Sequence, residues 1–428
     1  MARQRSCLTF EVEHSINFLV LERHNSVFYL GNGTYSSTEY LALGSISQIE
    51  TNATNAFEEL KIFRKTIQDW SFGWLNYDLK NELEDLNSNN PAQFNNAKLV
   101  FVQPELVFKI QPSEGKLKVQ CHFFPEVSSK EKIENLISEI WLETKLTDDR
   151  ETKETIEFQP SLSKEEYLKQ IDQVKAHIQR GDIYEANFCQ QFSATGSINP
   201  FLAYQRLIRA SPTPFAAFIR HNEFHTLCAS PERFLKKEGT RIITEPIKGT
   251  ISRSSDAEED LFLINKLKNS EKDQTENVMI VDLARNDLSK IAMKGSVKVE
   301  ELFGIYSFPH VHQMISKVVC EVDDTIDSVE IIKAMFPIAS MTGVPKISAV
   351  KIIDELEDFK RELYSGCIGY FTPESDFDFN VVIRSLFYNA STHKLSYAVG
   401  GAIINASDPE EEYDETLLKA KAIQSLFN

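Results

Sequence analysis

The sequence predicts an α+β fold with large antiparallel sheets, and three features of the chain indicate it. Strand-like runs at 365–373, 379–389 and 394–404 follow one another with only short turns between them. No helical pattern separates each pair of strands, although a doubly wound parallel sheet needs a crossover helix at every step. No segment repeats at a fixed period, which argues against a solenoid or a propeller.

In the N-terminal part of the chain, short apolar runs alternate with polar loops. The runs FLVLE at 18–22 and KLVFV at 98–102 are rich in branched and aromatic residues and are predicted as strands. The stretch 87–96 is polar, contains Pro91 and is predicted as an exposed loop. The charged segment 145–158 is expected to connect this part to the rest of the chain.

Helical patterns become clear beyond residue 160. Apolar residues recur at helical spacing through 163–180, with Ser163 and Glu166 as a capping box and Gly181 as the stop signal. Further helices are predicted at 256–285, 328–335, 345–356 and 414–427, and further strands at 233–250 and 312–322.

Composition and charge limit the classes of partner and compartment. The chain has 428 residues, of which 42% are hydrophobic, and a net charge of −17, so a folded protein that binds neither nucleic acid nor membrane surfaces is expected. Its six cysteines show no metal-like or disulfide-like spacing, the N-terminus lacks the apolar core of a signal peptide, and no run could span a bilayer. A cytoplasmic protein is therefore expected. The phosphate-binding glycine loops of nucleotide sites are also missing from the sequence.

Two pairs of acidic residues have the spacing of a metal site. Asp273 and Glu276 lie three residues apart, as do Glu412 and Glu415, so each pair shares one face of a predicted helix. Carboxylates from two helices suit Mg²⁺, which prefers a few oxygen ligands together with water and substrate oxygens. Solvated surface acids are the commoner explanation of this spacing.

Lys248 is a candidate nucleophile. It lies before Gly249 in a predicted strand of mostly apolar residues, where it could be buried. At an ordinary pKa near 10.4, roughly a few lysines in ten thousand are neutral at pH 7, so nucleophilic attack would require that the pKa be lowered. A lysine exposed at the edge of a strand is the alternative.

Three further features are compatible with a site for a small anion. His310 and His312 alternate on a predicted strand and are expected to face the same side, although two histidines alone are weak evidence for a metal. Arg384 lies within an apolar strand and needs an anionic partner, either a carboxylate of the protein or one of a substrate. Gly400 and Gly401 follow a strand and would let a ligand approach the backbone, unless they form a bulge.

The candidate residues above belong to segments that, taken together and in their order along the chain, resemble the motifs of the chorismate-utilising enzymes. The resemblance covers the chain from about residue 160 onward, and nine motifs in one order make it highly specific. The matching segments are 181–190, 230–234, 244–250, 273–288, 308–316, 340–346, 365–370, 381–385 and 399–416.

This resemblance implies two antiparallel sheets packed at an angle, helices on the outside and a central cleft for chorismate. Residues 1–145 would contribute to the same α+β unit as the chorismate-binding region, 160–428. Mg²⁺ would be held by Glu276 and Glu412, with Asp273 and Glu415 close by.

The resemblance also implies roles for the remaining residues. Glu232 would be the general acid, and His312 and Thr342 would line the ring of the substrate. The catalytic set would comprise Lys248, Glu232, His312 and Asn187. The substrate-binding set would comprise Arg384, Tyr370, Thr342, Gly249, Gly400, Gly401 and Lys419.

Lys248 distinguishes the branches of the family. Its motif resembles that of aminodeoxychorismate synthases, in which a lysine adduct precedes addition of ammonia at C4, whereas the other branches typically have alanine. Glu185 departs from the pattern, because aminating relatives usually carry glutamine there and water-adding relatives carry lysine. With no glutaminase signature in the chain, ammonia is expected from a separate glutamine amidotransferase subunit. The alternatives are anthranilate synthase component I and a non-catalytic binding protein on the same scaffold.

Overall fold

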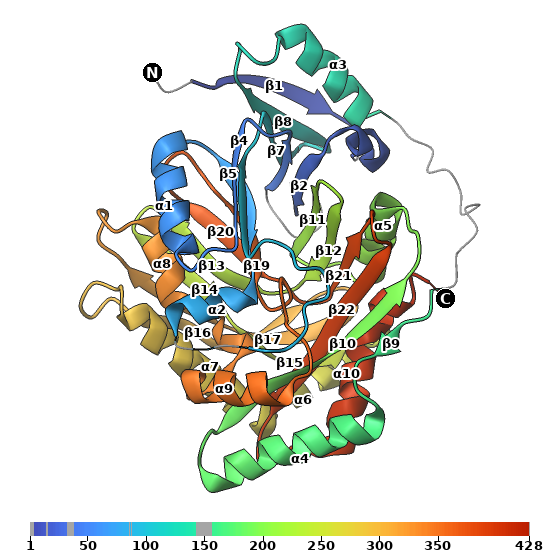
Figure 1. Cartoon of the computed structure of the whole chain (residues 1–428), viewed down its shortest axis with the longest axis vertical. Helices are drawn as coiled ribbons and strands as arrows, with labels where there is room; N and C mark the ends of the chain where they lie inside the picture. Colours follow the sequence, from blue (N-terminus) through green and yellow to red (C-terminus); the bar gives the residue numbers. More distant parts are fainter. Residues whose placement is uncertain are drawn as a thin grey trace.

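The computed structural model describes residues 4–13, 16–31, 38–84, 86, 88–142 and 156–427. Two large antiparallel sheets form its centre, and helices cover their outer faces (Figure 1). Every strand pairing among the described residues is antiparallel, so the predicted α+β class with two antiparallel sheets is confirmed. In the same part of the chain, no helix is both long and apolar enough to cross a membrane.

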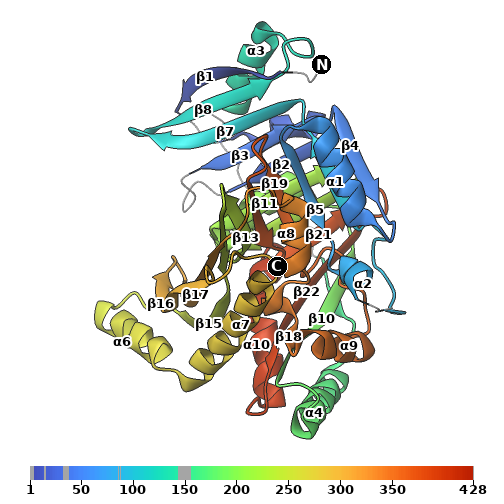
Figure 2. The same ribbon diagram turned by 90° about the vertical axis from the view of Figure 1, so that its left-hand side faces the viewer.

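Sheet A, the larger sheet, joins strands from both ends of the chain. Its 12 strands run in the order β1 (Ser6–Val12), β8 (Lys116–Phe123), β7 (Leu106–Ser113), β3 (Glu39–Leu43), β2 (Ser26–Leu30), β11 (Phe215–His221), β12 (Phe224–Ser230), β21 (Ser385–Asn389), β22 (Lys394–Ile403), β10 (Glu185–Thr195) and β18 (Gly343–Val344), with β9 (Gln159–Pro160) beside β10. N-terminal strands β1, β7 and β8 lie at one end of the molecule, together with α3 (Figure 2).

Sheet B, with 10 strands, also combines early and late segments. Its strands run in the order β15 (Ile247–Ser252), β17 (Val311–Glu321), β14 (Arg241–Glu245), β13 (Arg233–Glu238), β20 (Phe377–Val381), β19 (Cys367–Phe371), β5 (Ser71–Leu75), β6 (Leu99–Gln103) and β4 (Ser47–Thr51), with β16 (Lys298–Ser307) beside β17.

The longer helices cover the two sheets on different sides. Contacts place α1 and α7 against sheet B, and α5 and α10 against sheet A. The helices are α1 (Ala56–Ile67), α2 (Lys80–Leu83), α3 (Lys130–Ile140), α4 (Lys164–Arg180), α5 (Pro200–Ala210), α6 (Ala257–Lys268), α7 (Glu271–Ser289), α8 (Ser328–Met335), α9 (Lys346–Leu356) and α10 (Pro409–Gln424), with 3-10 turns η1 (Phe18–Arg23), η2 (Tyr77–Leu79) and η3 (Ala339–Met341).

A continuous apolar core lies between the sheets. It combines Phe28 and Ala217 of sheet A with Phe72, Leu235 and Phe379 of sheet B, all essentially buried. A second cluster fills the other face of sheet A, beneath α3, α5 and α10, and a third lies between α4, α9 and β10. Inner strands such as β5 and β6 are buried on both faces and consist mostly of apolar residues, whereas β1 and β4 alternate between exposed and partly buried residues.

The chain crosses from one sheet to the other at two places that adjoin. Glu232 lies between β12 of sheet A and β13 of sheet B, and Arg384 lies between β20 of sheet B and β21 of sheet A. The Val381 amide donates to the Glu232 carbonyl at 3.0 Å, and the Ala229 amide donates to the Arg384 carbonyl at 3.2 Å. These hydrogen bonds hold the two crossover segments side by side.

Several local predictions agree with the structure. The helix at 163–180 forms as α4, with the Ser163–Glu166 capping box and Gly181 in a left-handed conformation with φ 81°. The strand predicted at 98–102 forms as β6. The loop at 87–96 is irregular over its described part, 88–96, whereas 145–155 of the predicted connector lie outside the described residues.

Other local predictions are wrong, and each has a physical reason. The run at 18–22 is the 3-10 turn η1, because Phe18 and Leu21 are both buried at a spacing of three and the Asn17 side chain accepts from Leu19 N. The predicted helix 256–285 is two helices, since Ser270 caps a new start at α7. Helix α10 begins before 414, at Pro409, where Asp408 is the N-cap.

The strand predicted around Arg384 is also wrong in detail. The run 379–389 divides into β20 and β21, and Arg384 lies in the break with φ 51°. Gly400 and Gly401 lie within β22 rather than after it. His310 precedes β17 and is exposed, whereas His312 lies in β17 and is buried, so the two histidines do not share a face.

Candidate active site

Lys248 lies at the edge of sheet B, where the strand register breaks. Strand β15 pairs with β17 at Ile247 and again from Thr250, and Gly249 between them has φ 85°. That irregularity turns the lysine side chain inward, so Lys248 is only 8% exposed. Its Nζ atom donates to Oε1 of Glu185 on sheet A at 2.8 Å. The alternative of an exposed lysine at the strand edge is therefore wrong.

The charge around Lys248 does not meet the expectation of a lowered pKa. Burial by itself lowers the pKa of the Lys248 amine, but the negative charges of Glu185 and Glu276 outweigh it and raise the pKa above 10.5. Without a ligand, the protein therefore holds Lys248 as an ammonium ion. Any nucleophilic role requires that its proton be transferred.

Glu276 on α7 is a buried carboxylate with an unused oxygen. It is 7% exposed, and its Oε1 atom accepts no hydrogen bond from any of the residues that the structure describes. Burial raises its pKa to about 7, because the loss of hydration exceeds the stabilisation by Lys248. A cation at this oxygen would restore ordinary ionisation.

Lys272 joins the acidic residues of α7 and α10. Its Nζ atom donates to Oε1 of Glu412 at 3.5 Å, and Glu412, Glu276 and Glu415 together raise the pKa of Lys272 against the effect of burial. Glu412 is buried and Glu415 is exposed. Glu276 of the first predicted pair and both acids of the second therefore act on the same cation.

Asp273 and Lys419 lie on either side of the acidic group formed by Glu276, Glu412 and Glu415. A β-carbon on Gly249 would stand 2.9 Å from Oδ1 of Asp273, so the start of α7 lies directly against the bulge that carries Lys248. Lys419 Nζ donates to the Gly400 carbonyl at 2.9 Å and pairs with Glu415 at 2.8 Å.

The two glycines of β22 allow close packing at this place. A β-carbon on Gly400 would stand 2.2 Å from the Phe188 carbonyl of β10, and one on Gly401 would stand 3.2 Å from Oε2 of Glu412. Gly401 thus provides the space that the Glu412 carboxylate occupies.

The residues present fit a divalent cation that is completed by other ligands. Among the residues that the structure describes, no three acidic, histidine or cysteine side chains form a metal cage by themselves. Mg²⁺ commonly takes one or two carboxylates and completes its shell with water and substrate oxygens. The unpartnered oxygen of Glu276 and the nearby Glu412 match that donor set.

Glu232 and Arg384 meet where the chain crosses between the sheets. Burial raises the pKa of Glu232 to about 7, so this carboxyl is largely protonated below neutrality. Burial lowers the pKa of Arg384, whereas the charge of Glu232 opposes the change. Throughout the described part of the chain, the Arg384 side chain donates no hydrogen bond to the protein, which leaves its guanidinium available to an anion.

The family comparison adds independent evidence. The sequence pattern of the family described as chorismate binding enzyme matches residues 23–425. The chain belongs to the chorismate-binding enzymes. The resemblance in the motifs is thereby confirmed.

Relatives of known name support the same assignment. The chain is 40% identical over 269 residues to aminodeoxychorismate synthase component 1 of Salmonella typhimurium, covering 63% of this chain and 59% of that protein. It is 32% identical over 382 residues to the Bacillus subtilis protein of the same name, covering 88% and 79%. Among solved structures, anthranilate synthase component I of Streptococcus pneumoniae matches with a TM-score of 0.79 and 23% identity, covering 91% and 92%.

Within this chorismate-binding enzyme, Asn187 and Thr342 are held on the sheet A side. Asn187 Nδ2 donates to the Ser340 carbonyl at 3.1 Å, and its amide donates to the Thr342 carbonyl at 2.7 Å. Thr342 is fully buried, and its hydroxyl donates to the Ala339 carbonyl at 2.9 Å. Asn187 lies two residues after Glu185 on β10, so both side chains point to the same face of the strand.

His312 and Tyr370 have other contacts in the chorismate-binding fold. Both ring nitrogens of His312 are engaged, with Ser307 Oγ at 2.8 Å and Asp260 Oδ1 at 2.9 Å. Tyr370 packs its ring against Tyr40 at 4.5 Å, and within the described residues no contact joins it to Arg384. Their roles at the ring and the carboxylate remain predictions.

Sequence reasoning missed a buried ion pair behind the site. Arg361 pairs with Glu357 at 2.6 Å and donates to the carbonyls of Asn187 and Met341, both at 2.7 Å. Glu357 also accepts from the Cys189 amide at 2.9 Å. The i, i+4 spacing of Glu357 and Arg361 was the available signal, but the charged neighbours of α9 gave no indication of burial.

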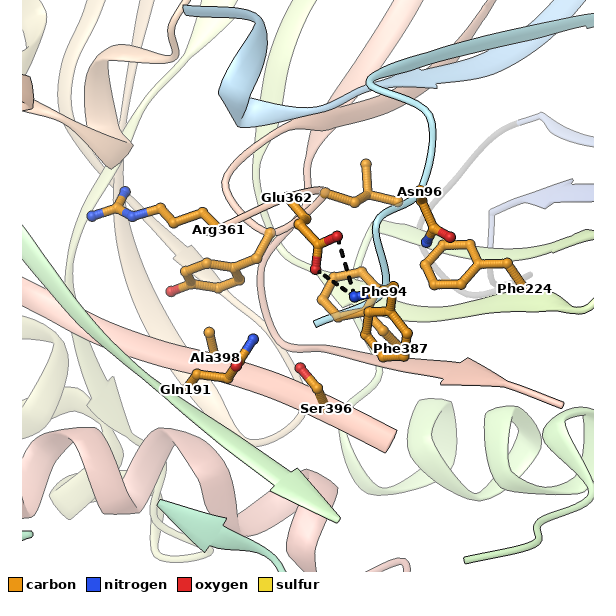
Figure 3. Close-up of a pocket in the computed structure, with 11 residues that line it drawn as sticks. Phe94, Asn96, Gln191, Phe224, Arg361, Glu362, Phe387, Ser396 and Ala398 are labelled. Atoms are coloured by element: carbon orange, nitrogen blue, oxygen red, sulfur yellow. Dashed lines mark hydrogen bonds between the residues drawn. The ribbon is translucent and has the colours of Figure 1, made fainter. Parts of the chain in front are cut away.

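A small cavity lies beyond Asn187 along β10. Phe94, Phe224, Phe387, Gln191 and Tyr364 line it, and the Glu362 carboxylate accepts from the Phe94 amide at its rim (Figure 3). The Tyr364 hydroxyl lies 3.5 Å from Cys189 Sγ. The cavity therefore adjoins the part of β10 that carries Glu185 and Asn187, and it does not include Lys248.

Proposed function

We propose that this chain acts as aminodeoxychorismate synthase component I, converting chorismate and ammonia into 4-amino-4-deoxychorismate and water. The observation that carries the proposal is Lys248, buried between three carboxylates at the meeting of the two sheets. Relatives that bear this name in Salmonella typhimurium and Bacillus subtilis support the choice. The chain spans 59% of the length of the Salmonella relative.

Two positive groups would hold the two carboxylates of chorismate. Arg384 would bind the enolpyruvyl carboxylate, and Glu276 and Glu412 would hold a Mg²⁺ ion whose charge would neutralise the ring carboxylate. When bound, Mg²⁺ supplies Lewis-acid polarisation of the ring system. Local cations explain how a chain of net charge −17 accepts a dianion.

The reaction then proceeds by two displacements. The neutral amine of Lys248 forms a bond to C2, the ring double bond shifts, and the C4–O bond breaks as Glu232 gives its proton to the departing hydroxide, which leaves as water. Ammonia next forms a bond to C4, the double bond shifts back, and the C2–N bond to Lys248 breaks. Covalent catalysis of this kind divides one difficult displacement into two easier steps.

Protonated Glu232 suits the role of acid. Its pKa of about 7 lies near the working pH, where a general acid is most effective. Asn187 would orient the groups around the lysine, and Thr342 and the backbone of Gly400 and Gly401 would border the substrate.

Ammonia would come from a partner protein. The name component 1 in the relatives indicates a second component, and we assign it as a glutamine amidotransferase subunit. Ammonium salts would replace this subunit in a test with the chain alone.

Anthranilate synthase component I is the second candidate. A relative of this name in Aquifex aeolicus is 31% identical over 360 residues, covering 82% of this chain and 72% of that protein. Anthranilate synthesis would leave the buried amine of Lys248 without a chemical task.

Product identification tests the proposal. The purified chain is incubated with chorismate, Mg²⁺ and ammonium, and the products are separated by chromatography. We expect 4-amino-4-deoxychorismate, and a loss of its formation in the Lys248→Ala variant. Anthranilate as product would favour the second candidate, unimpaired turnover by the variant would remove the nucleophile, and no product would indicate a binding protein.

A further inference from the structure

We propose that Glu185 is the proton acceptor for Lys248, so that the attacking amine is made neutral inside the site rather than by bulk water. This role rests on the proposed function, because it concerns the same lysine and the same displacement. The proposed reaction by two displacements assigns no role to Glu185, although its carboxylate is buried in the site.

The geometry of the pair suits a direct proton transfer. Nζ of Lys248 and Oε1 of Glu185 lie 2.8 Å apart, within the range of a charge-assisted hydrogen bond. Glu185 has no exposed surface, and Lys248 is 8% exposed, so little water reaches the hydrogen bond. No other acceptor of a hydrogen bond from the Lys248 amine is present among the described residues.

The second oxygen of Glu185 strengthens the case. Oε2 is buried and accepts no hydrogen bond from the part of the chain that the structure describes. A structural carboxylate in a low-dielectric interior normally has both oxygens satisfied, because an unpaired one costs free energy. Oε2 of Glu185 is therefore an unused acceptor inside the site, which a purely structural ion pair does not require.

Other charged groups face the same lysine. Glu276 from α7 and Glu232 from the crossover segment raise the pKa of Lys248, Glu415 from α10 acts at longer range, and Asp273 lies behind Gly249. In the proposed complex, Glu276 would hold Mg²⁺ and Glu232 would be protonated. Glu185 is then the carboxylate left to receive the proton from Lys248.

The proton balance closes over one cycle. The proton on the Lys248 ammonium moves to Glu185, and the neutral amine forms its bond to C2 while Glu232 protonates the hydroxide that leaves C4. When ammonia has added at C4, the adduct nitrogen leaves C2 with its electron pair, and Glu185 returns its proton to it. The ammonia nitrogen gives its surplus proton to Glu232, so both acids regain their starting states.

This arrangement predicts a particular pH dependence. In the wild type, the proton moves within the pair, so kcat/KM needs no loss of a proton to solvent from Lys248. In Glu185→Gln, the lysine must lose that proton to water. The ratio of wild-type to variant kcat/KM should therefore fall about tenfold for each pH unit from 6 to 8, from roughly 100-fold or more at pH 6.

The ratio of the two kcat/KM values removes the pH dependence that the other titrating groups cause, because both proteins contain those groups. A ratio that stays constant with pH would overturn the proposal, since a merely structural role lowers the variant equally at each pH. Glu39→Gln is the matched control, because Glu39 is another buried glutamate of sheet A, on β3, bonded to Tyr29. Its ratio should not change with pH, and Glu185→Asp should restore a constant ratio.

Two measurements keep the test decisive if the glutamine variant does not fold or if the proposed product is not formed. If Glu185→Gln does not fold, the same ratio is measured with Glu185→Ala, and a ratio that stays constant with pH again overturns the proposal. Without substrate, acetic anhydride labelling of Lys248, read by peptide mass spectrometry, should reach half-maximum at lower pH in Glu185→Gln than in the wild type. Unchanged labelling refutes the proton link, whereas a shift in labelling with no aminated product refutes only the proposed function.

Discussion

Gly249 lies so close to Asp273 that a β-carbon added to it would stand 2.9 Å from the carboxylate oxygen Oδ1. Its backbone is also left-handed, with φ 85°. We expect Gly249→Ala to lose about 2 kcal/mol or more of unfolding free energy, from backbone strain together with the clash. The same variant should turn over chorismate more slowly, because the bulge positions Lys248. Denaturant unfolding and steady-state kinetics check these two effects.

Gly115 provides the matched control for this prediction. It has a similar φ of 82°, but a β-carbon there would meet nothing within 4 Å. Gly115→Ala should cost only about 1 kcal/mol and leave turnover unchanged. Equal losses for the two alanine variants would contradict the proposed contact with Asp273.

Glu232 should make stability fall as pH rises. Its folded pKa of about 7 lies above its ordinary value of 4.5, so the folded state binds more protons than the unfolded state between these values. The contribution is complete below pH 4.5 and is lost as pH rises through 7. Relative to Glu232→Gln, the wild type should lose about 2–4 kcal/mol across this window. Glu276 makes stability depend on pH over the same range, but it is present in both proteins and cancels from their difference.

Urea unfolding of wild type and Glu232→Gln at pH 5, 6, 7 and 8, without Mg²⁺, measures the difference. The variant should also lose turnover by about 100-fold or more, because glutamine cannot supply the proton. Parallel stability curves would show that Glu232 ionises normally in the folded protein.

Lys272 should compete with Mg²⁺ for the acidic group. Its ammonium lies 3.5 Å from Glu412 and close to Glu276, so it already neutralises part of the negative charge that would bind the metal. Lys272→Met should therefore bind Mg²⁺ up to about fivefold more tightly, since partly exposed pairs contribute up to about 1 kcal/mol. Thermal unfolding over a range of MgCl₂ concentrations, with chelator as the zero point, reports the affinity.

Lys290→Met serves as the control on the same helix. Lys290 pairs with Asp287 at 2.9 Å, at the far end of α7, and its removal should leave the affinity for Mg²⁺ unchanged. If neither variant alters the affinity, Mg²⁺ does not bind where Lys272 meets Glu412.

Arg361 should be the most costly cation to remove. It is buried, pairs with Glu357 and supports the backbone at Asn187 and Met341. Arg361→Met should lose about 3–5 kcal/mol, because the charge of Glu357 remains buried without a partner. Arg23→Met, which removes the exposed pair with Glu139, should cost less than about 1 kcal/mol. Chemical denaturation of both variants measures the two losses of unfolding free energy. Equal losses would contradict the prediction that the buried pair is the more costly one to break.

Local signals in the sequence predicted local structure well. The capping box at Ser163 predicts α4, because its hydrogen bonds form within one turn of the chain. The start of α10 has an equally local signal, Asp408 followed by Pro409, which lies before the predicted start at 414. The break between α6 and α7 also has a local signal, because Ser270 caps the start of α7.

The site itself was predictable only in part. Motif resemblance identified Lys248, Glu232, Glu276 and Glu412 as residues of one cleft, and the contacts of Lys248 and Lys272 bring these side chains together. The pairing of Lys248 with Glu185 could not be predicted, because the two are 63 positions apart and belong to different sheets. Its consequence, a raised rather than lowered pKa, depends on that tertiary contact and not on the local sequence.

The hydrogen bond between Glu185 and Lys248 has a mechanical consequence. One partner is carried by each sheet, and the acidic residues of α7 and α10 are divided in the same way, so the reacting groups are assembled only while the sheets keep their mutual alignment. A sideways slip of one sheet by an ångström would separate donor from acceptor well before either sheet unravelled. Cavity-forming substitutions deep in the apolar layer, far from chorismate, should therefore slow turnover at temperatures where the protein is still folded.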